Sequence, residues 1–389
     1  MNLDELARSA EHGDFSTLLR ELSDRFEDEG NYALLFESLI LEERFRRDLP
    51  LVGELTDEVM DDDTRQAMET YYADCCRRVG ELFLAAGDPG QAFPYFRTIR
   101  ELESIRAALH EWWRRAPEDR APQHEAFIEI ALGQGLDPII GYAALLAHRG
   151  ICDGITFLEQ RFPFGADVRR QCVQRLNRAL HEELLEAIQR ELVEHEGSRM
   201  EAPLVDVLKG RRWLFREQHS HVDDSHLQAT IRFGLILDDP ADLERSIELC
   251  VYGMHLPAAY QHQEACPFED FYNDYRLLYS GLAGRETNRS VEHFAGKLAR
   301  QADQNPRGTH FPAEVLAFLQ SRVGRAEEAL ETYERYLASS PRLSLCPPLL
   351  DLCRAAGNFS PLLDLARSRG NALQYAIGLI ERYRAAASD

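Results

Sequence analysis

The densest group of side chains that could do chemistry lies between residues 218 and 226, which read Gln-His-Ser-His-Val-Asp-Asp-Ser-His. Imidazole nitrogens and carboxylate oxygens are good ligands for zinc, iron or manganese. The first two histidines are two residues apart and share a face of a loop or strand, whereas an aspartate and a histidine three apart share a face of a helix. A junction between loop and helix could therefore direct several groups at one divalent transition metal, with candidate ligands His219, His221, Asp223, Asp224 and His226.

The same segment has a simpler interpretation as the start of a helix. Aspartate and serine are favoured N-cap residues because their side-chain oxygens accept hydrogen bonds from the first free N–H groups of a helix. Apolar residues at helical spacing follow at Leu227, Ile231 and Leu235. The histidines would then bond to neighbouring helix ends, and no recognised metal motif such as HExxH is present. We favour this interpretation and expect no cofactor, with the metal site as the alternative.

Other signals of catalysis are weak. The chain has no GxSxG motif, no Gly-rich phosphate loop and no dinucleotide-binding fingerprint, so an enzyme is the less favoured reading. Residues 252–279 are rich in aromatic side chains at helical spacing. Such a stripe is typical of a core, although it could also serve a regulator that senses a peptide or a small molecule.

Composition limits the partners. The chain has 389 residues and a net charge of −22, which repels nucleic-acid phosphates and anionic membranes. Its beginning, Met-Asn-Leu-Asp-Glu-Leu, does not resemble a secretory signal, and no apolar run approaches the roughly 18 residues of a membrane-spanning helix. The eight scattered cysteines suit reduced, mostly buried thiols. We therefore expect a cytoplasmic protein whose partner is a protein or peptide.

The elements that must position any site are helices. Almost every segment carries apolar residues at helical spacing, and Gly or Pro breaks the pattern after about 10 to 20 residues. Residues 168–195 contain no such breaker and predict one unusually long helix. We expect an all-α solenoid of antiparallel helix pairs in three parts: an N-terminal repeat array (1–165), a long connecting helix (166–200) and a C-terminal array (201–389).

Two stretches resemble the tetratricopeptide repeat, a helix–turn–helix unit of about 34 residues. In residues 310–341, Leu316, Gly324, Ala329, Tyr333 and Pro341 stand where that family places packing and turn residues. In residues 73–104 the matching residues are Gly80, Phe83, Gly87, Asp88, Ala92, Phe96 and Ile99. The resemblance implies stacked helix pairs and a protein-interaction scaffold or adaptor as the function. The alternative is a metal-dependent enzyme or sensor with a His/Asp site around residues 219–226.

The resemblance also implies where a ligand would bind. In that family the first helix of each unit lines a groove, and its contact positions correspond to Arg77, Glu81 and Ala85 in one unit and to Glu314, Phe318 and Arg322 in the other. Members that clamp a C-terminal carboxylate carry Lys or Arg with Asn there, whereas Glu81 would repel a carboxylate. The implied ligand is therefore mixed apolar and charged, and the candidate contacts are Arg77, Phe318 and Arg322. Phe318 could instead be a core residue of its helix.

Overall fold

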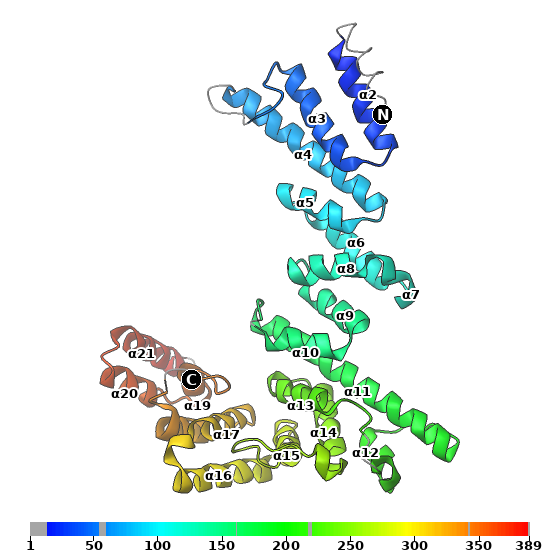
Figure 1. The fold of residues 1–389 in the computed structure, drawn as a ribbon. Coiled ribbons are helices and arrows are strands. Elements are labelled where there is room, and N and C mark those ends of the chain that lie inside the picture. Colours follow the sequence, from blue (N-terminus) through cyan, green and yellow to red (C-terminus); the bar gives the residue numbers. More distant parts are fainter. Residues whose placement is uncertain (1–13, 54–59, 161, 217–219, 341–342, 388–389) are drawn as a thin grey trace. The chain divides into compact units, whose positions relative to one another are not determined.

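The computed structural model describes residues 14–53, 60–160, 162–216, 220–340 and 343–387. Throughout these ranges the chain forms helices and connecting turns, without a β-strand (Figure 1). The prediction of an all-α protein is confirmed. Contacts cluster into two compact parts, which we call unit 1 (Met1–Gly154) and unit 2 (Ile155–Asp389).

Unit 1 begins with helices whose first turns are capped by acidic or amide side chains. Asp14, Asn31, Asp61, Asp88 and Asp137 each accept a hydrogen bond from a backbone N–H in the helix that follows. The helices are α2 (Phe15–Asp28), α3 (Tyr32–Arg46), α4 (Asp62–Ala85), α5 (Pro89–Ile99), α6 (Glu103–Arg114), α7 (Pro117–Arg120), α8 (His124–Ile128) with a π-helical turn (Glu129–Gly133), and α9 (Pro138–Arg149).

Unit 2 contains most of the remaining helices, and α10 (Ile151–Glu159) crosses the boundary between the units. The others are α11 (Ala166–Glu196), α12 (Leu204–Leu208), α13 (Asp224–Phe233), α14 (Pro240–His255), α15 (Phe271–Leu282), α16 (Thr287–Gln304), α17 (His310–Arg322), α18 (Ala326–Thr332) with a π-helical turn (Tyr333–Leu337), α19 (Leu349–Ala356), α20 (Ser360–Ser368) and α21 (Ala372–Ala386).

In unit 1, α4 and α5 pack together through the small residues that the repeat resemblance singles out. A Cβ at Gly80 would lie 2.8 Å from the ring of Phe96, so only glycine leaves room for that aromatic side chain. Ala92 is completely buried in α5. The turn between the helices contains Gly87 at φ +78°, a left-handed conformation that glycine adopts without strain.

In unit 2, α17 and α18 repeat these features. Gly324 turns the chain at φ +80°, and Ala329 is completely buried where α18 packs on α17. Leu316 and Tyr333 are also buried, whereas Pro341 lies outside the described residues. Gly80, Ala92, Phe96, Leu316, Ala329 and Tyr333 are thus packing residues, and Gly87 and Gly324 are turn residues.

The long helix predicted at 168–195 is present as α11, which spans Ala166–Glu196. Its buried stripe includes Leu176, Leu180, Leu184, Ile188 and Leu192. It ends at Gly197, whose φ of +81° terminates the helix in a left-handed conformation. Within unit 2, this stripe packs against α13 and α14.

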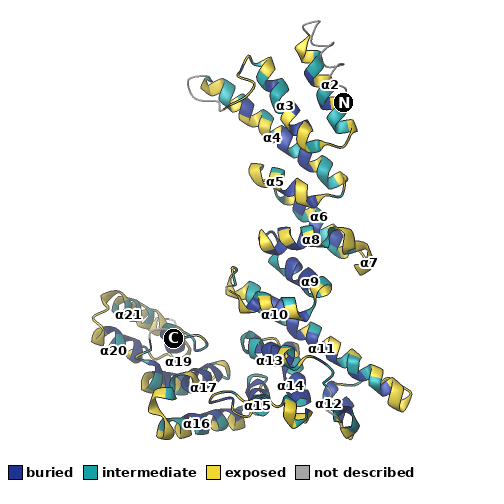
Figure 2. Cartoon of the chain, viewed as in Figure 1, coloured by how far each residue is buried: buried dark blue, intermediate teal, exposed yellow. Residues whose placement is uncertain are grey.

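The aromatic stripe of residues 252–279 forms part of the core of unit 2. Burial is complete or nearly so for Tyr252, Phe268, Phe271, Tyr272, Tyr275 and Tyr279. A Cβ at Gly253 would lie 2.2 Å from the Tyr272 ring, so α14 accommodates this ring at a glycine. Figure 2 shows α14 and α15 drawn mostly in the colour of buried residues.

Every helix in the described ranges is too short or too polar to span a membrane. All eight cysteines are free thiols, and six of them are buried. Burial raises the pKa of these thiols, for example to about 11 for Cys75 and to about 12 for Cys172. The buried cysteines therefore remain protonated at neutral pH and act as small apolar packing residues.

Candidate functional site

The segment around residue 223 begins a helix, as its capping residues predict. Asp223 is the N-cap of α13, and its Oδ1 accepts hydrogen bonds from the backbone N of Ser225 at 2.8 Å and from the Ser225 hydroxyl at 2.6 Å. The hydrogen bond from the Ser225 hydroxyl, and to a lesser extent the backbone bond, lowers the pKa of Asp223. Asp224 follows within the first turn and accepts a hydrogen bond from Gln228 at 3.5 Å.

His221 is built into the core beside this helix. Its side chain is completely buried, with Nδ1 3.0 Å from the hydroxyl of Tyr252 and Nε2 3.3 Å from a carboxylate oxygen of Glu191. The backbone N–H of His221 also donates to the Tyr252 hydroxyl at 2.9 Å. His221 therefore ties the loop before α13 to α14 and α11 within unit 2.

The predicted metal ligands other than His221 lie in two settings: Asp223, Asp224 and His226 belong to the start of α13, and His219 is outside the described residues. In the described ranges, no three His, Cys, Asp or Glu side chains form a group that could hold a metal ion. His226 lies in the first turn of α13, where its backbone N–H donates to Asp223 at 3.4 Å.

The three predicted partner contacts lie in different surroundings. The side chain of Arg77 is 39% exposed and donates hydrogen bonds to Glu101 at 2.7 and 2.8 Å and to Asp74 at 2.7 Å. These hydrogen bonds raise the pKa of Arg77, and those to Glu101 have the largest effect. Arg322 donates to the carbonyl oxygen of Leu237 at 3.4 Å, and its guanidinium lies 5.6 Å from the ring centroid of Phe318.

Phe318 is buried, with 6% of its surface exposed. Every residue from 312 to 320 of α17 is buried, so this helix has core neighbours on all sides (Figure 2). A helix surrounded in this way has no free groove face at that position. The burial of Phe318 favours its packing role, which was the alternative to ligand contact.

A groove that we call the α4 groove lies in unit 1 beside the repeat unit of residues 73–104. It encloses about 560 Å³ between α3, α4 and the end of α5. Apolar and aromatic atoms come from Ile40, Met60, Met68, Tyr72, Ala73 and Ile99. The ring of Tyr72 is 40% exposed and meets Phe36 edge to face at 5.2 Å, so its position is fixed by packing.

Charged side chains surround this apolar floor. Arg44 donates to the carbonyl oxygens of Pro50 at 3.2 Å and Gly53 at 3.0 Å, which holds it at one end of the groove. Glu101 accepts from Arg77, and this ion pair lowers the pKa of Glu101. Arg65 and Glu69 complete the charged lining. The groove thus offers apolar contact together with charges of both signs.

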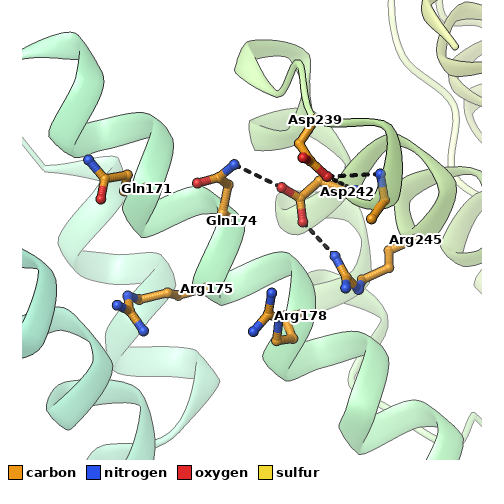
Figure 3. Close-up of a pocket in the computed structure, with 8 residues that line it drawn as sticks. Gln171, Gln174, Arg175, Arg178, Asp239, Asp242 and Arg245 are labelled. Carbon is orange, nitrogen blue, oxygen red and sulfur yellow. Dashed lines mark hydrogen bonds and ion pairs between the residues drawn. The ribbon is translucent and has the colours of Figure 1, made fainter.

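A second cavity, the arginine pocket, lies between α11 and α14 of unit 2 and encloses about 270 Å³ (Figure 3). Its lining is Gln171, Gln174, Arg175, Arg178, Asp239, Ala241, Asp242 and Arg245. Asp242 is buried and accepts from Arg245 at 2.6 Å and from Gln174 at 2.9 Å. Asp239 caps α14 by accepting from the backbone N of Ala241 at 2.9 Å.

Buried polar contacts continue from this pocket along the two helices. Asn177 donates to the Ser246 hydroxyl at 2.8 Å and to the carbonyl oxygen of Asp242 at 3.1 Å. One turn further on, Nε2 of His181 lies 2.6 Å from a carboxylate oxygen of Glu248. These contacts fix the register of α11 on α14, and hence the positions of the pocket residues, because unpaired buried polar groups are costly.

Sequence reasoning did not identify either cavity. The only local signal for the arginine pocket is the spacing of Gln171, Gln174, Arg175 and Arg178, which places polar groups on one side of α11. The α4 groove offers apolar contacts next to charges of both signs, and the arginine pocket offers mainly polar and cationic contacts. Comparison of this chain with protein-family models, with curated protein sequences and with solved structures gives no match.

Proposed function

We propose that this protein is a helical-repeat scaffold that binds a segment of another protein in the α4 groove. The observation that carries the proposal is the position of the groove, which lies on the helix pair resembling a tetratricopeptide repeat. Ala73, Thr98, Ile99 and Glu101 line it from the beginning and the end of that unit, and Tyr72 lines it from the residue just before the unit. Solenoid proteins built from stacked helical repeats commonly bind their partners on extended concave surfaces.

The packing residues support the solenoid architecture on which the scaffold function depends. Gly80 and Ala92 allow close approach of α4 and α5, and Gly324 and Ala329 occupy the matching places in α17 and α18. In such an architecture each helix pair buries its apolar face against its neighbours in antiparallel stacks. The same helix–turn–helix device thus occurs in both units.

The ligand class follows from the lining of the groove. Its volume of about 560 Å³ falls in the range that is typical of ligand-binding pockets. The apolar floor suits an aliphatic or aromatic side chain, whereas the arginine and glutamate residues around it suit charged neighbours in the same peptide. We infer a peptide segment that carries an apolar anchor between charged residues.

The test compares two variants of α4 that add the same charge. Ala73→Arg places a long side chain in the groove, whereas Thr70→Arg adds it at an exposed position of the same helix that does not line the groove. Proteins captured by the wild type and by each variant are compared by quantitative mass spectrometry. A partner retained by Thr70→Arg and lost with Ala73→Arg supports the proposal.

A purified partner then allows the affinity to be measured by calorimetry. We expect Ala73→Arg to weaken binding by at least about tenfold, the effect of losing about 1.4 kcal/mol of binding free energy. Equal capture by the wild type and both variants would show that the α4 groove binds no partner.

A further inference from the structure

We propose that the arginine pocket binds a small multivalent oxyanion, namely a phosphorylated or polycarboxylate small molecule. This inference goes beyond the scaffold function, because it concerns a different cavity, in unit 2, and a different class of ligand. The juxtaposition that carries it is Arg178 on α11 beside Arg245 of α14, which belongs to a network with Asp242 of α14 and Gln174 of α11 (Figure 3).

The charge of the lining favours an anion. Three arginines and two aspartates line the cavity, which gives it a formal charge of +1 in a chain of −22. Both aspartates are already hydrogen-bonded. Asp242 binds Arg245 through one oxygen and Gln174 through the other, and Asp239 accepts from two backbone N–H groups at the start of α14. Asp242 and Arg245 offset each other as an ion pair, and in the rest of the lining two arginines, Arg175 and Arg178, outnumber the single carboxylate of Asp239.

Arg178 is the group that an incoming anion would pair with first. It is exposed, it lines the pocket, and it forms no ion pair within the described part of the chain. Arg245 is held by Asp242 at 2.6 Å, so its guanidinium is oriented before any ligand arrives. Figure 3 shows the guanidinium groups of Arg178 and Arg245 on the same side of the Gln174–Asp242 hydrogen bond.

Guanidinium groups recognise phosphate and carboxylate through paired, charge-assisted hydrogen bonds. The amides of Gln171 and Gln174 add polar contacts at the same cavity. Two arginines from different helices fit an anion with several oxygens better than a single monovalent ion, because each can occupy a separate oxygen pair. The lining is too polar to favour an apolar ligand.

The size of the cavity limits the ligand further. A volume of about 270 Å³ lies just below the range typical of drug-sized ligands, so a compact metabolite fits it. A bound anion would contact both α11 and α14. Because it would bind only the folded arrangement, it would stabilise unit 2 by mass action. The scaffold would thereby respond to the concentration of a small anion.

The test uses calorimetric titration of the full-length protein with inorganic phosphate and, separately, with citrate, at constant ionic strength. Arg178→Gln removes the unpaired cation, and Arg190→Gln is the matched control. Arg190 is exposed on the same helix, forms no ion pair among the described residues, and lies twelve residues away, about 18 Å along the axis. Circular dichroism verifies that both variants remain helical.

We expect at least one anion to bind the wild type and Arg190→Gln equally, and Arg178→Gln to bind it at least about tenfold more weakly. Binding of phosphate but not citrate identifies a phosphorylated ligand, and the reverse result identifies a polycarboxylate. Absence of saturable binding for both probes, or equal affinity in Arg178→Gln, would overturn the proposal. Neither result bears on the α4 groove, which is tested by partner capture.

Discussion

At the scale of single residues, Phe318 shows how packing determines the role of a motif position. The repeat resemblance places it among possible groove contacts, but its side chain is buried along with every residue from 312 to 320. The sequence of α17 carries a signal for this, because its apolar residues lie on all faces of the helix, as in helices enclosed by a core. By contrast, Arg77 keeps an exposed guanidinium in an ion pair with Glu101.

The burial of Phe318 leads to a prediction about stability. Phe318→Ala should lower the free energy of unfolding by about 3–5 kcal/mol, because it removes a buried aromatic ring and leaves a cavity. Phe311→Ala is the matched control, since Phe311 is in the same helix and is 41% exposed. Urea denaturation monitored by circular dichroism measures both. Similar small losses in the two variants would show that Phe318 is not a core residue.

A second residue-scale prediction concerns the paired imidazoles of His124 and His148 in unit 1. Their rings stack with centroids 4.5 Å apart, and Nε2 of His148 is buried without a hydrogen-bond partner among the described residues. Burial foremost, and then the nearby charge of His124, lower the pKa of His148 below its ordinary value of 6.5. His148 therefore favours the neutral state in the folded protein.

The sign of the resulting pH dependence follows from proton linkage. Between the lowered pKa of His148 in the folded protein and its ordinary value of about 6.5, the unfolded chain binds more protons than the folded chain. The contribution of neutral His148 to stability is therefore complete above about pH 6.5, and it is lost as the pH falls towards the folded pKa. The slope for one proton is at most about 1.4 kcal/mol per pH unit. Unfolding at about pH 7.5 and about pH 5.5 should show a smaller pH effect in His148→Gln than in the wild type. An unchanged pH effect would contradict this assignment.

At the scale of helices, the sequence is most informative where a pattern is local. The stripe from Leu176 to Leu192 has no breaker, and α11 extends only slightly beyond the predicted 168–195. The partners of a helix are much harder to predict, because they depend on contacts between distant residues. Gln174 meets Asp242 across 68 residues, and His181 meets Glu248 across 67. The arginine pocket depends on the pairing of α11 with α14 and could not be derived from local spacing.

The packing of α15 and α16 includes a buried ionic cluster that can be tested. Asp274 is completely buried and binds Lys297 at 2.6 Å and His293 at 2.7 Å. Lys297→Met should cost about 3–5 kcal/mol, because it leaves the buried carboxylate without its principal cation. Lys209→Met is the control, since Lys209 pairs with Asp206 at 2.5 Å on the surface and its loss should cost less than about 1 kcal/mol.

The double variant Lys297→Met/Asp274→Leu separates charge from shape. Replacing both partners by apolar side chains should recover part of the stability that Lys297→Met loses, because no unpaired buried charge remains. Denaturation of the single and double variants gives the coupling free energy of the pair. Additive losses would show that the two groups do not stabilise each other.

At the scale of the whole molecule, the all-α class follows from periodic apolar residues and regular breakers. The sequence predicts parts that meet at residues 165 and 200, on either side of the long helix. The contacts cluster on either side of residue 154, and α11 lies in unit 2, where its apolar stripe packs on α13 and α14. The sequence carries no local signal for a boundary at residue 154, because helix α10 continues across it.

The two units should unfold in two separate calorimetric transitions, because each has its own buried core and the chain exceeds the size of one compact core. Ala92→Leu overpacks the core of unit 1, and Ala329→Leu overpacks that of unit 2, each at a cost of about 1–3 kcal/mol. Each variant should therefore lower the midpoint of one transition, by about 2–4 °C for each kcal/mol lost, and leave the other unchanged.

Ala299→Leu is the control for this experiment, since Ala299 is exposed on α16 and tolerates a larger side chain without overpacking. A single transition that moves equally with Ala92→Leu and Ala329→Leu would show that the two units unfold as one cooperative body. If the two midpoints move separately, the units unfold independently. A ligand that binds only one unit then stabilises that unit alone, because binding shifts only the unfolding equilibrium in which the ligand takes part. Phosphate or citrate in the arginine pocket would then raise only the midpoint that Ala329→Leu lowers.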